Sequence, residues 1–186
     1  LKAIVLDLRD NPGGLLTQSA YVTEKFVPKG QIVVTTEGRE QRQLDKLVAS
    51  GRFKERTLPM VVLVNGGSAS ASEIVAGCLQ DLGRAELVGM KTFGKGSVQS
   101  ILPLHDGSAL RLTTAKYYTP KHRIIHGKGI TPDHVVEMTP EQMGHIALQR
   151  SQGGLETLPE EERKKAKATK DLQLKKALEL LKAKLK

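Results

Sequence analysis

One segment near the middle of the sequence constrains the fold more than any other, because it joins an apolar strand to an amphipathic helix through a short turn. Residues 60–64 are Met-Val-Val-Leu-Val, a β-branched run that is typical of a buried strand. From Ala71 the apolar residues follow the spacing of a helix with one apolar face. That face consists of Ile74, Val75, Cys78, Leu79 and Leu82. A buried strand that leads directly into a helix predicts an α/β protein.

Similar patterns along the chain predict alternating strands and helices, followed by several strands. We expect strands at 3–8, 31–36, 60–64, 86–89, 97–102, 109–118 and 134–138. We expect helices at 15–27 and from Ala71, and partly helical structure in the charged span 38–56. Asp106-Gly107 lies between two of the predicted strands and favours a hairpin turn.

The composition changes beyond about residue 150, where Gly153-Gly154 and Pro159 interrupt the chain and residues 160–186 favour one helix. Its leucines follow a heptad spacing of four, three and four residues. They are Leu174, Leu178, Leu181 and Leu185. Two heptads are too short for an independent coiled coil, so we expect this helix to pack on the domain or to join subunits into a homo-oligomer. The sequence thus predicts a core at 1–150 and a basic helical extension at 151–186.

The net charge of +9, from 29 Lys and Arg against 20 Asp and Glu, raises the possibility of a nucleic-acid partner. More than half of the excess lies in residues 159–186, which hold 10 basic and 5 acidic residues. Only three Tyr and three Phe are available to stack on bases. We therefore expect no nucleic acid and an acidic partner or second subunit for the basic helix. The single cysteine, Cys78, excludes an internal disulfide and a multi-cysteine metal site.

The turn between the predicted strand and helix reads Asn65-Gly-Gly-Ser-Ala-Ser-Ala-Ser-Glu73. Two glycines and small residues allow a sharp turn that exposes a hydroxyl beside free N–H groups at a helix N-terminus. A nucleophile at Ser70 would therefore have an oxyanion donor next to it. Ser70 and Glu73 also fit a capping box, in which Ser70 only caps the helix.

A second polar segment, Thr92-Phe-Gly-Lys-Gly-Ser-Val-Gln99, places Lys95 between two glycines just before a strand. The glycines allow a close backbone approach, so the Lys95 amine could lie against a serine hydroxyl. A lysine acts as a general base only when it is desolvated and its pKa falls well below about 10.4. Gln99 shares a strand face with Lys95 and could hold it in position. A lone lysine is otherwise an exposed loop residue.

Together these motifs resemble the carboxyl-terminal processing (tail-specific) proteases over residues 1–138. The motifs that carry the resemblance occur in the family's order, which makes it far more specific than one short pattern. They are Asp7-Leu-Arg-Asp-Asn-Pro-Gly-Gly14, Gly67-Ser-Ala-Ser-Ala-Ser-Glu-Ile74, Leu79-Gln-Asp-Leu-Gly-Arg-Ala85, Thr92-Phe-Gly-Lys-Gly-Ser-Val-Gln99 and Gly129-Ile-Thr-Pro-Asp133.

The resemblance implies a crotonase-like or ClpP-like β-β-α protease core with a serine–lysine dyad and no cofactor or metal. Ser70 matches the family's nucleophile, Lys95 its general base and Gln99 its glutamine. The family's oxyanion hole uses the amide after the nucleophile, here Ala71, and a glycine that is either Gly13 or Gly14. Asp81 matches an acidic position implicated in activity, although a structural salt bridge with the neighbouring Arg84 suits it equally well.

The implied activity is cleavage of polypeptides near their C-terminal tails, in a bacterial periplasm or cell envelope. Lys95 would take the Ser70 proton during attack on the peptide carbonyl, and an acyl-enzyme would then be hydrolysed. None of the five histidines lies in a comparable motif, so a Ser-His-Asp triad is the weaker hypothesis. The family also carries a PDZ domain ahead of the core, which nothing in this chain resembles, so we expect a partial protease.

Two other functional classes compete with the protease. Gly89, followed by Gly94-Lys95, matches the phosphate-loop spacing of nucleotide-binding proteins, and Val5-Leu6-Asp7 could imitate their acidic strand. However, Gly96 stands where Ser or Thr must bind magnesium, a strand follows the loop, and the acidic strand comes first. The other class is a latent scaffold that needs an adaptor or activator protein. The intact set of Ser70, Lys95 and Gln99 argues against it.

Overall fold

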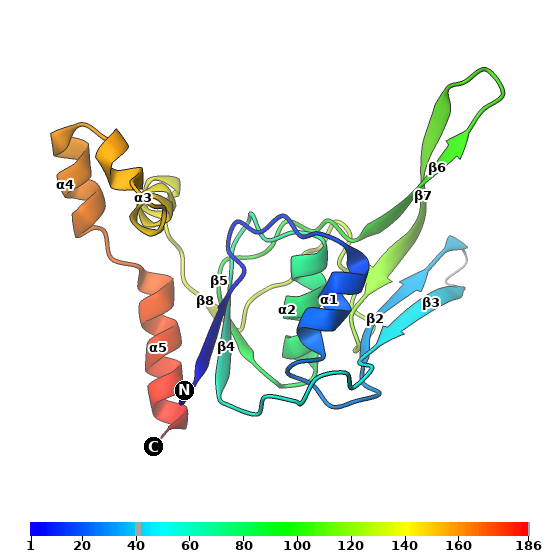
Figure 1. Cartoon of the computed structure of the whole chain (residues 1–186), viewed down its shortest axis with the longest axis horizontal. Helices are drawn as coiled ribbons and strands as arrows, with labels where there is room; N and C mark the ends of the chain where they lie inside the picture. The colour runs from blue at the N-terminus through cyan, green and yellow to red at the C-terminus, as the bar shows by residue number, and fades with distance from the viewer. Residues whose placement is uncertain (40–41, 186) are drawn as a thin grey trace.

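The computed structural model describes residues 1–39 and 42–185 and contains two four-stranded sheets (Figure 1). One sheet is parallel, with the order β1-β4-β5-β8. Its strands are β1 (Ile4–Asp7), β4 (Met60–Val64), β5 (Glu86–Gly89) and β8 (His134–Val135). The other sheet is antiparallel, with the order β3-β2-β7-β6. Its strands are β2 (Ile32–Glu37), β3 (Gln43–Val48), β6 (Ser97–Pro103) and β7 (Ala109–Tyr118). The mixed α/β class predicted from the sequence is confirmed.

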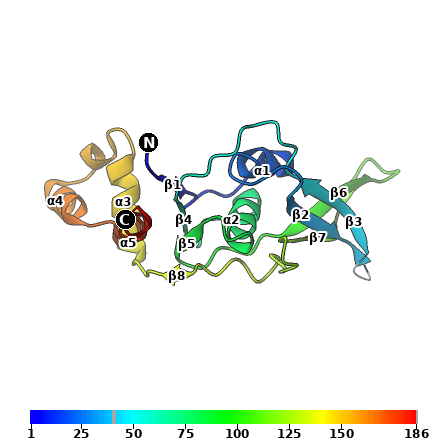
Figure 2. The same ribbon diagram turned by 90° about the horizontal axis from the view of Figure 1, so that it is seen from below.

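The helices are α1 (Leu16–Thr23), α2 (Ala71–Asp81), α3 (Pro140–Arg150), α4 (Glu160–Ala168) and α5 (Leu172–Lys184), with a short 3₁₀ turn at Gly154–Thr157. Three of them, α1, α2 and α5, cover the parallel sheet, whereas α3 and α4 lie beyond it at one end of the molecule (Figure 1). Helices α1 and α2 lie between the two sheets, and α5 covers the other face of the parallel sheet (Figures 1 and 2). The β6–β7 hairpin projects from the opposite end of the molecule (Figure 1).

Strand β4 lies at the centre of the core because all five of its residues are buried. Side chains alternate between the two faces of a strand. Accordingly, Val62 and Val64 join the main core beside α2, whereas Val61 and Leu63 pack with Ala177 and Leu181 of α5 and its neighbours. A strand covered on both faces explains the uninterrupted apolar run in the sequence.

Two predictions in the charged parts of the chain are wrong. The span 38–56, of which residues 40 and 41 lie outside the described part, contains strand β3 and no α-helix among its described residues, because residues 43–48 complete a hairpin with β2. The span 160–186, of which Lys186 is not described, is two helices that break at residues 169–171. Asp171 starts α5 by accepting a 2.9 Å hydrogen bond from Leu174 N, which is a typical N-cap. Helix α3 was not predicted.

The leucine seam of α5 packs mainly on its own domain, which is one of the two predicted outcomes. Leu181 is buried and Leu174 half-buried against the parallel sheet, whereas Leu178 and Leu185 are 44% and 48% exposed. The homo-oligomer through this helix stays a prediction, as does the boundary at residue 150. Within the described ranges, no helix combines the length and the apolar character that crossing a membrane requires.

Candidate active site

Ser70 lies at a sharp turn between the loop after β4 and the first residue of α2. Its backbone has φ 56° and ψ −119°, which a residue with a side chain rarely adopts. Thr139, which caps α3, shows the extended conformation of an ordinary N-cap, with φ −68° and ψ 157°. Ser70 is therefore held in a conformation that costs on the order of 1–3 kcal/mol and that capping does not require. Strained turns of this kind present nucleophiles.

Hydrogen bonds of the residues just before Ser70 fix the Ser70 turn. Ser68 Oγ donates to Leu8 O at 2.7 Å and accepts from Asn65 N at 3.0 Å. Ala69 N donates to Asn11 O at 3.0 Å. These bonds join the Ser70 turn to the loop that follows β1, so the two predicted halves of the oxyanion hole lie side by side.

Glu73 connects the Ser70 turn to the Lys95 loop and is fully buried. Its Oε2 accepts from Ser70 N at 2.9 Å and from Lys95 N at 2.8 Å. Its Oε1 accepts from Thr92 Oγ1 at 2.5 Å and from Gly94 N at 2.8 Å. The sequence predicted Glu73 only as half of a capping box. No pattern could have revealed these bonds, since they join segments about twenty residues apart.

The Lys95 side chain is exposed. The two glycines beside Lys95 were expected to allow a close approach to a serine. In the structure both pack against the loop at residues 125–129. A Cβ on Gly94 would lie 3.1 Å from Gly129 N, and one on Gly96 would lie 2.5 Å from His126 N. Glu73 and a 3.0 Å bond from Phe93 N to Ser68 O bring the loop to the serine instead.

Gln99 lies on β6 and is exposed. The pairing of β6 with β7 shifts between Val98 and Gln99. Within the described part of the chain, no hydrogen bond joins Gln99 to Lys95, so its positioning role stays a prediction.

The two candidate oxyanion glycines differ in their surroundings. Gly13 has φ +98°, and a Cβ there would lie 2.8 Å from Ala71 N and 2.9 Å from Ser70 Cβ. Its N–H donates to Asn11 Oδ1 at 2.9 Å. A Cβ on Gly14 would meet nothing within 4 Å. Among the described residues, neither Gly14 N nor Ala71 N has a hydrogen-bond partner.

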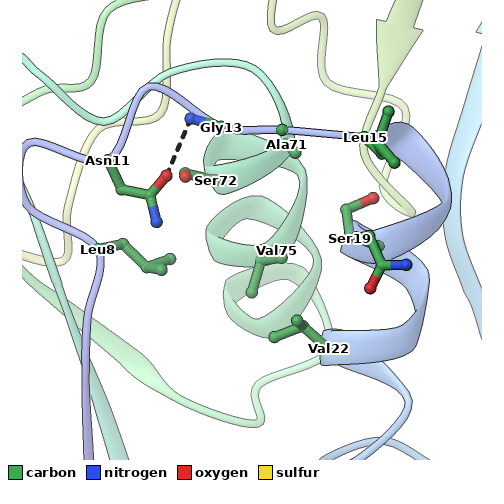
Figure 3. Close-up of a pocket in the computed structure, with 11 residues that line it drawn as sticks. Leu8, Asn11, Gly13, Leu15, Ser19, Val22, Ala71, Ser72 and Val75 are labelled. Atoms are coloured by element: carbon green, nitrogen blue, oxygen red, sulfur yellow. Dashed lines mark hydrogen bonds between the residues drawn. The ribbon is translucent and has the colours of Figure 1, made fainter.

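A pocket of about 180 Å³ opens beside these glycines and the start of α2 (Figure 3). Its wall is formed mainly by apolar side chains of β1's following loop, α1 and α2. The apolar members are Leu8, Leu15, Val22, Ala71 and Val75. The pocket can take an uncharged side chain next to the Ser70 turn.

Asp81 lies at the far end of α2, about 16 Å along the helix from Ser70 at 1.5 Å per residue. Its carboxylate is buried, pairs with Arg123 and accepts from Lys121 N at 2.8 Å. Arg84, the partner proposed from the sequence, instead donates to backbone carbonyls, among them Phe26 O at 2.9 Å. Asp81 therefore braces the loop near residue 121, and its part in activity stays a prediction.

Cys78 is fully buried in the core. Burial, and secondarily the charge of Asp81, raises the pKa of the thiol to about 12, so it is inert near neutral pH. Across residues 1–39 and 42–185, no group of three or more His, Cys, Asp or Glu converges in a way that could hold a metal ion.

Comparisons with known proteins show which family the chain belongs to. Residues 1–136 match the profile described as peptidase family S41. The chain is 58% identical over 137 residues to the carboxy-terminal-processing protease of Bartonella bacilliformis, covering 74% of this chain and 31% of that protein. It is 50% identical over 133 residues to the carboxyl-terminal-processing protease of Synechocystis sp., covering 72% and 30%. The chain thus spans under a third of these relatives' length.

Solved structures of peptidases also resemble this chain. The photosystem II D1 C-terminal processing protease matches with a TM-score of 0.69 and 39% identity, over 74% of this chain and 35% of that one. A putative peptidase from Parabacteroides merdae shares the fold over 97% of this chain and 52% of its own, with a TM-score of 0.66 and 20% identity. The motifs, the turn at Ser70 and these matches agree, and the chain belongs to peptidase family S41, the serine-type peptidases.

Proposed function

We propose that this chain forms the catalytic core of an endopeptidase that cleaves polypeptides at or near their C-terminal tails through a Ser70–Lys95 dyad. One observation carries the proposal. Ser70 N and Lys95 N both donate to the same Glu73 oxygen, at 2.9 and 2.8 Å, which keeps the two nitrogens within about 6 Å of each other. The backbones of two residues that are 25 positions apart in the sequence are thereby held next to each other.

In the proposed reaction, neutral Lys95 accepts the Ser70 proton as Ser70 Oγ attacks the substrate carbonyl. The carbonyl oxygen becomes an oxyanion that accepts hydrogen bonds from Ala71 N–H and Gly14 N–H, neither of which has another partner among the described residues. Lys95 then protonates the leaving amine, and water hydrolyses the acyl-enzyme. Since Lys95 is exposed in the structure, bound polypeptide would supply the desolvation that the neutral amine needs.

Gly13 and Gln99 would position the reacting groups. Gly13 permits the close approach of its loop to Ser70, because its missing Cβ leaves the space that the turn occupies. Gln99 would orient the Lys95 amine from the neighbouring strand. We place the enzyme in the periplasm or cell envelope, as the family resemblance implies.

The dyad is tested by cleavage of an unstructured protein with the wild-type enzyme and the Ser70→Ala and Lys95→Ala variants. Lys91→Ala removes another exposed lysine from the same segment and is the matched control. We expect both dyad variants to lose about 10³-fold or more in kcat and the control to retain its activity. Equal cleavage by all four proteins would refute the dyad.

The apolar pocket beside Ala71 predicts the residue preferred on the acyl side of the cleaved bond. Its volume of about 180 Å³ and its Leu and Val lining suit small to medium apolar side chains. In a peptide series we expect kcat/KM for Ala, Val or Leu at this position to exceed that for Asp by about 100-fold, because the pocket offers a carboxylate no compensating charge. A preference for Asp would exclude this pocket as the specificity site.

The nucleotide-binding alternative is not favoured. Residues 97–103 after the Lys95 loop form strand β6, so no helix N-terminus follows the loop to bind phosphates. The match to peptidase relatives points the same way.

A further inference from the structure

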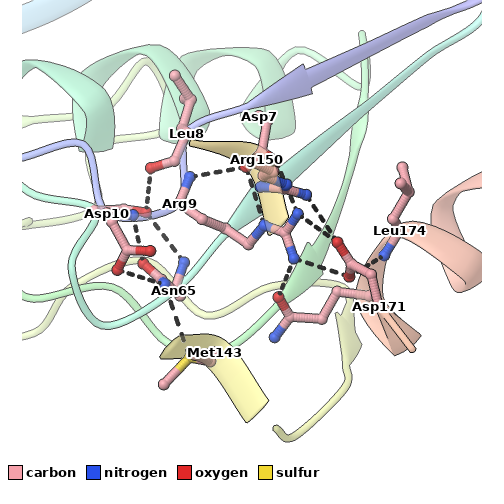
Figure 4. Close-up of polar contacts among 11 residues, drawn as sticks. Asp7, Leu8, Arg9, Asp10, Asn65, Met143, Arg150, Asp171 and Leu174 are labelled. Atoms are coloured by element: carbon pink, nitrogen blue, oxygen red, sulfur yellow. Dashed lines mark hydrogen bonds and ion pairs between the residues drawn. The ribbon is translucent and has the colours of Figure 1, made fainter. Parts of the chain in front are cut away.

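Residues 137–186 lie outside the matched family region, so the match assigns no role to the helices that they form. These helices meet the loop after β1 at a polar cluster close to the candidate site (Figure 4). We call it the Arg9 cluster and define it by its members. They are Asp7, Arg9, Arg150, Asp171 and Gln173.

Arg9 is the centre of this cluster, and each of its five N–H groups has an acceptor. It donates to Asp7 from Nε at 3.0 Å and from Nη2 at 2.8 Å. It donates to Asp171 from Nη1 at 2.9 Å and from Nη2 at 2.8 Å, and Nη1 also reaches Gln173 Oε1 at 3.0 Å. The Arg9 side chain is only 5% exposed. Because guanidinium–carboxylate forks are strongly directional, this set fixes Arg9 in one position.

The partners of Arg9 belong to the C-terminal helices. Asp171 is the N-cap of α5, and the fully buried Gln173 donates from Nε2 to Val136 O at 2.9 Å. Arg150, the last residue of α3, donates to Asp7 Oδ2 at 2.6 Å and to Asp171 Oδ2 at 2.7 Å. The ends of α3 and α5 thus converge on the residues that begin the loop, and the two arginine charges balance the two aspartate charges.

The other side of this loop lies against the Ser70 turn. Asp10 and Asn65 exchange two hydrogen bonds, of 2.9 and 2.8 Å. Asn11 O accepts from Ala69 N at 3.0 Å, and Asn11 Oδ1 accepts from Gly13 N at 2.9 Å. Between Arg9 and Gly14 the chain is therefore held at one end by the helices and along its length by the turn that carries the nucleophile.

We propose that the C-terminal helices brace the loop at residues 9–14, the proposed oxyanion loop, with Arg9 and Asp171 as positioning residues. Their contact fixes the Gly13–Gly14 peptide relative to Ser70. This inference rests on the proposed function, since it takes the loop as the source of an oxyanion donor. A donor of this kind acts on the transition state more than on bound substrate, so a loosened loop lowers kcat and leaves KM nearly unchanged.

The test uses Asp171→Asn in the complete enzyme, because Asn caps a helix as well as Asp but carries no charge for Arg9. Glu160→Gln, which removes an exposed pair with Lys164 in the same extension, is the matched control. We expect Asp171→Asn to lower kcat about tenfold with KM changed less than about twofold. We also expect faster hydrogen exchange of the Asp10 and Ala69 amides, and no change in the control.

A second variant, Arg9→Lys, keeps the charge but loses the fork, and should lower kcat and speed exchange in the same way. Unchanged kcat and exchange in a folded Asp171→Asn or Arg9→Lys enzyme would overturn the brace. So would a loss of activity that equals the unfolded fraction measured by circular dichroism. The exchange measurement needs no activity, so it tests the brace even where wild-type and Ser70→Ala enzymes prove equally active and the dyad itself fails.

Discussion

Glu73 is the residue on which the geometry of the site depends most directly. It is fully buried, and its two oxygens accept four hydrogen bonds from the Ser70 turn and from the Lys95 loop. A carboxylate can accept at both oxygens without donating, and its negative charge shortens and strengthens these bonds. The same residue thus ties the backbone at Lys95 to the backbone at Ser70.

Glu73→Gln places an NH₂ group where one oxygen now faces two donors. We expect a loss of about 1–3 kcal/mol in the free energy of unfolding and a fall in kcat of about 10² or more, since the dyad loses its alignment. Urea denaturation and initial cleavage rates measure the two effects. Glu141→Gln, in the first turn of α3 and exposed, is the control. Wild-type kcat in Glu73→Gln would show that the carboxylate does not position the dyad.

Adding a single Cβ atom at Gly13 or at Gly14 tests how closely each glycine approaches the Ser70 turn. Gly13→Ala would place a Cβ 2.9 Å from Ser70 Cβ and 2.6 Å from Ala69 O, at a φ of +98°. We expect it to destabilise the fold by about 1–3 kcal/mol and to abolish cleavage. Gly14→Ala, whose Cβ would meet nothing within 4 Å, should retain the wild-type melting temperature within a few degrees. Equal melting temperatures for the two variants would contradict the close approach of Gly13.

Among the secondary-structure elements, α5 has the clearest structural task. The parallel sheet has one face against α1 and α2, and α5 covers the other (Figures 1 and 2). The apolar side chains that β4 directs toward that face would otherwise contact water. Covering them explains the apolar stripe of a helix whose remaining surface is strongly basic.

Leu181→Ala is therefore expected to cost about 2–5 kcal/mol in the free energy of unfolding, because Leu181 is 4% exposed against the sheet. Leu178→Ala, from the same seam but 44% exposed, should cost less than about 1 kcal/mol. Denaturation of both variants measures the packing of the leucine seam on the sheet, and sedimentation measures whether the seam joins subunits. A dimer or larger assembly that dissociates in Leu178→Ala would support the predicted homo-oligomer. Equal destabilisation would contradict the packing described above.

At the scale of the whole molecule, ion pairs hold the C-terminal helices to the core at both ends of α5. The Arg9 cluster lies at its start. At its end, Lys184 Nζ lies 2.6 Å from Glu86 Oε1 of β5, and His134 Nε2 of β8 lies 2.5 Å from Glu86 Oε2. Part of the basic charge of the extension is thus used to attach it to acidic residues of the core.

This arrangement gives stability a dependence on pH. The hydrogen bond from His134, followed by that from Lys184, lowers the pKa of Glu86 below 4.5 in the folded state. The resulting stabilisation is present above about pH 4.5 and disappears as the pH falls through the folded-state pKa. Between about pH 6 and about pH 3.5, the free energy of unfolding should therefore fall less in Glu86→Gln than in the wild type. The difference between the two falls should be under about 1 kcal/mol, because the pair is partly exposed.

Urea denaturation across this range measures the difference, and Glu160→Gln, another exposed glutamate, should follow the wild type. Parallel pH curves for Glu86→Gln and the wild type would show that the pair adds nothing to stability.

The elements that could be predicted from sequence are those whose pattern is local. Strand β4, strand β5 and the start of α2 lie where apolar runs and periodicity place them, because burial on two faces or one face leaves a direct trace in the sequence. Strand β3 and the break before α5 could not be predicted in this way. The first depends on pairing with β2, and the second on a cap, Asp171, within a run of good helix formers.

The same division applies to the site. By itself the sequence determined the α/β class, the family resemblance and the candidate dyad of Ser70 and Lys95, since short motifs record the backbone shapes that a nucleophile turn and a glycine-flanked lysine require. The tertiary structure decided that Glu73 joins the two, that Asp81 pairs with Arg123, and that the C-terminal helices meet the loop at residues 9–14 through Arg9. Apart from the local Ser70–Glu73 bond, these contacts form between residues about 20 to 160 positions apart, and only folding determines which distant donors and acceptors meet.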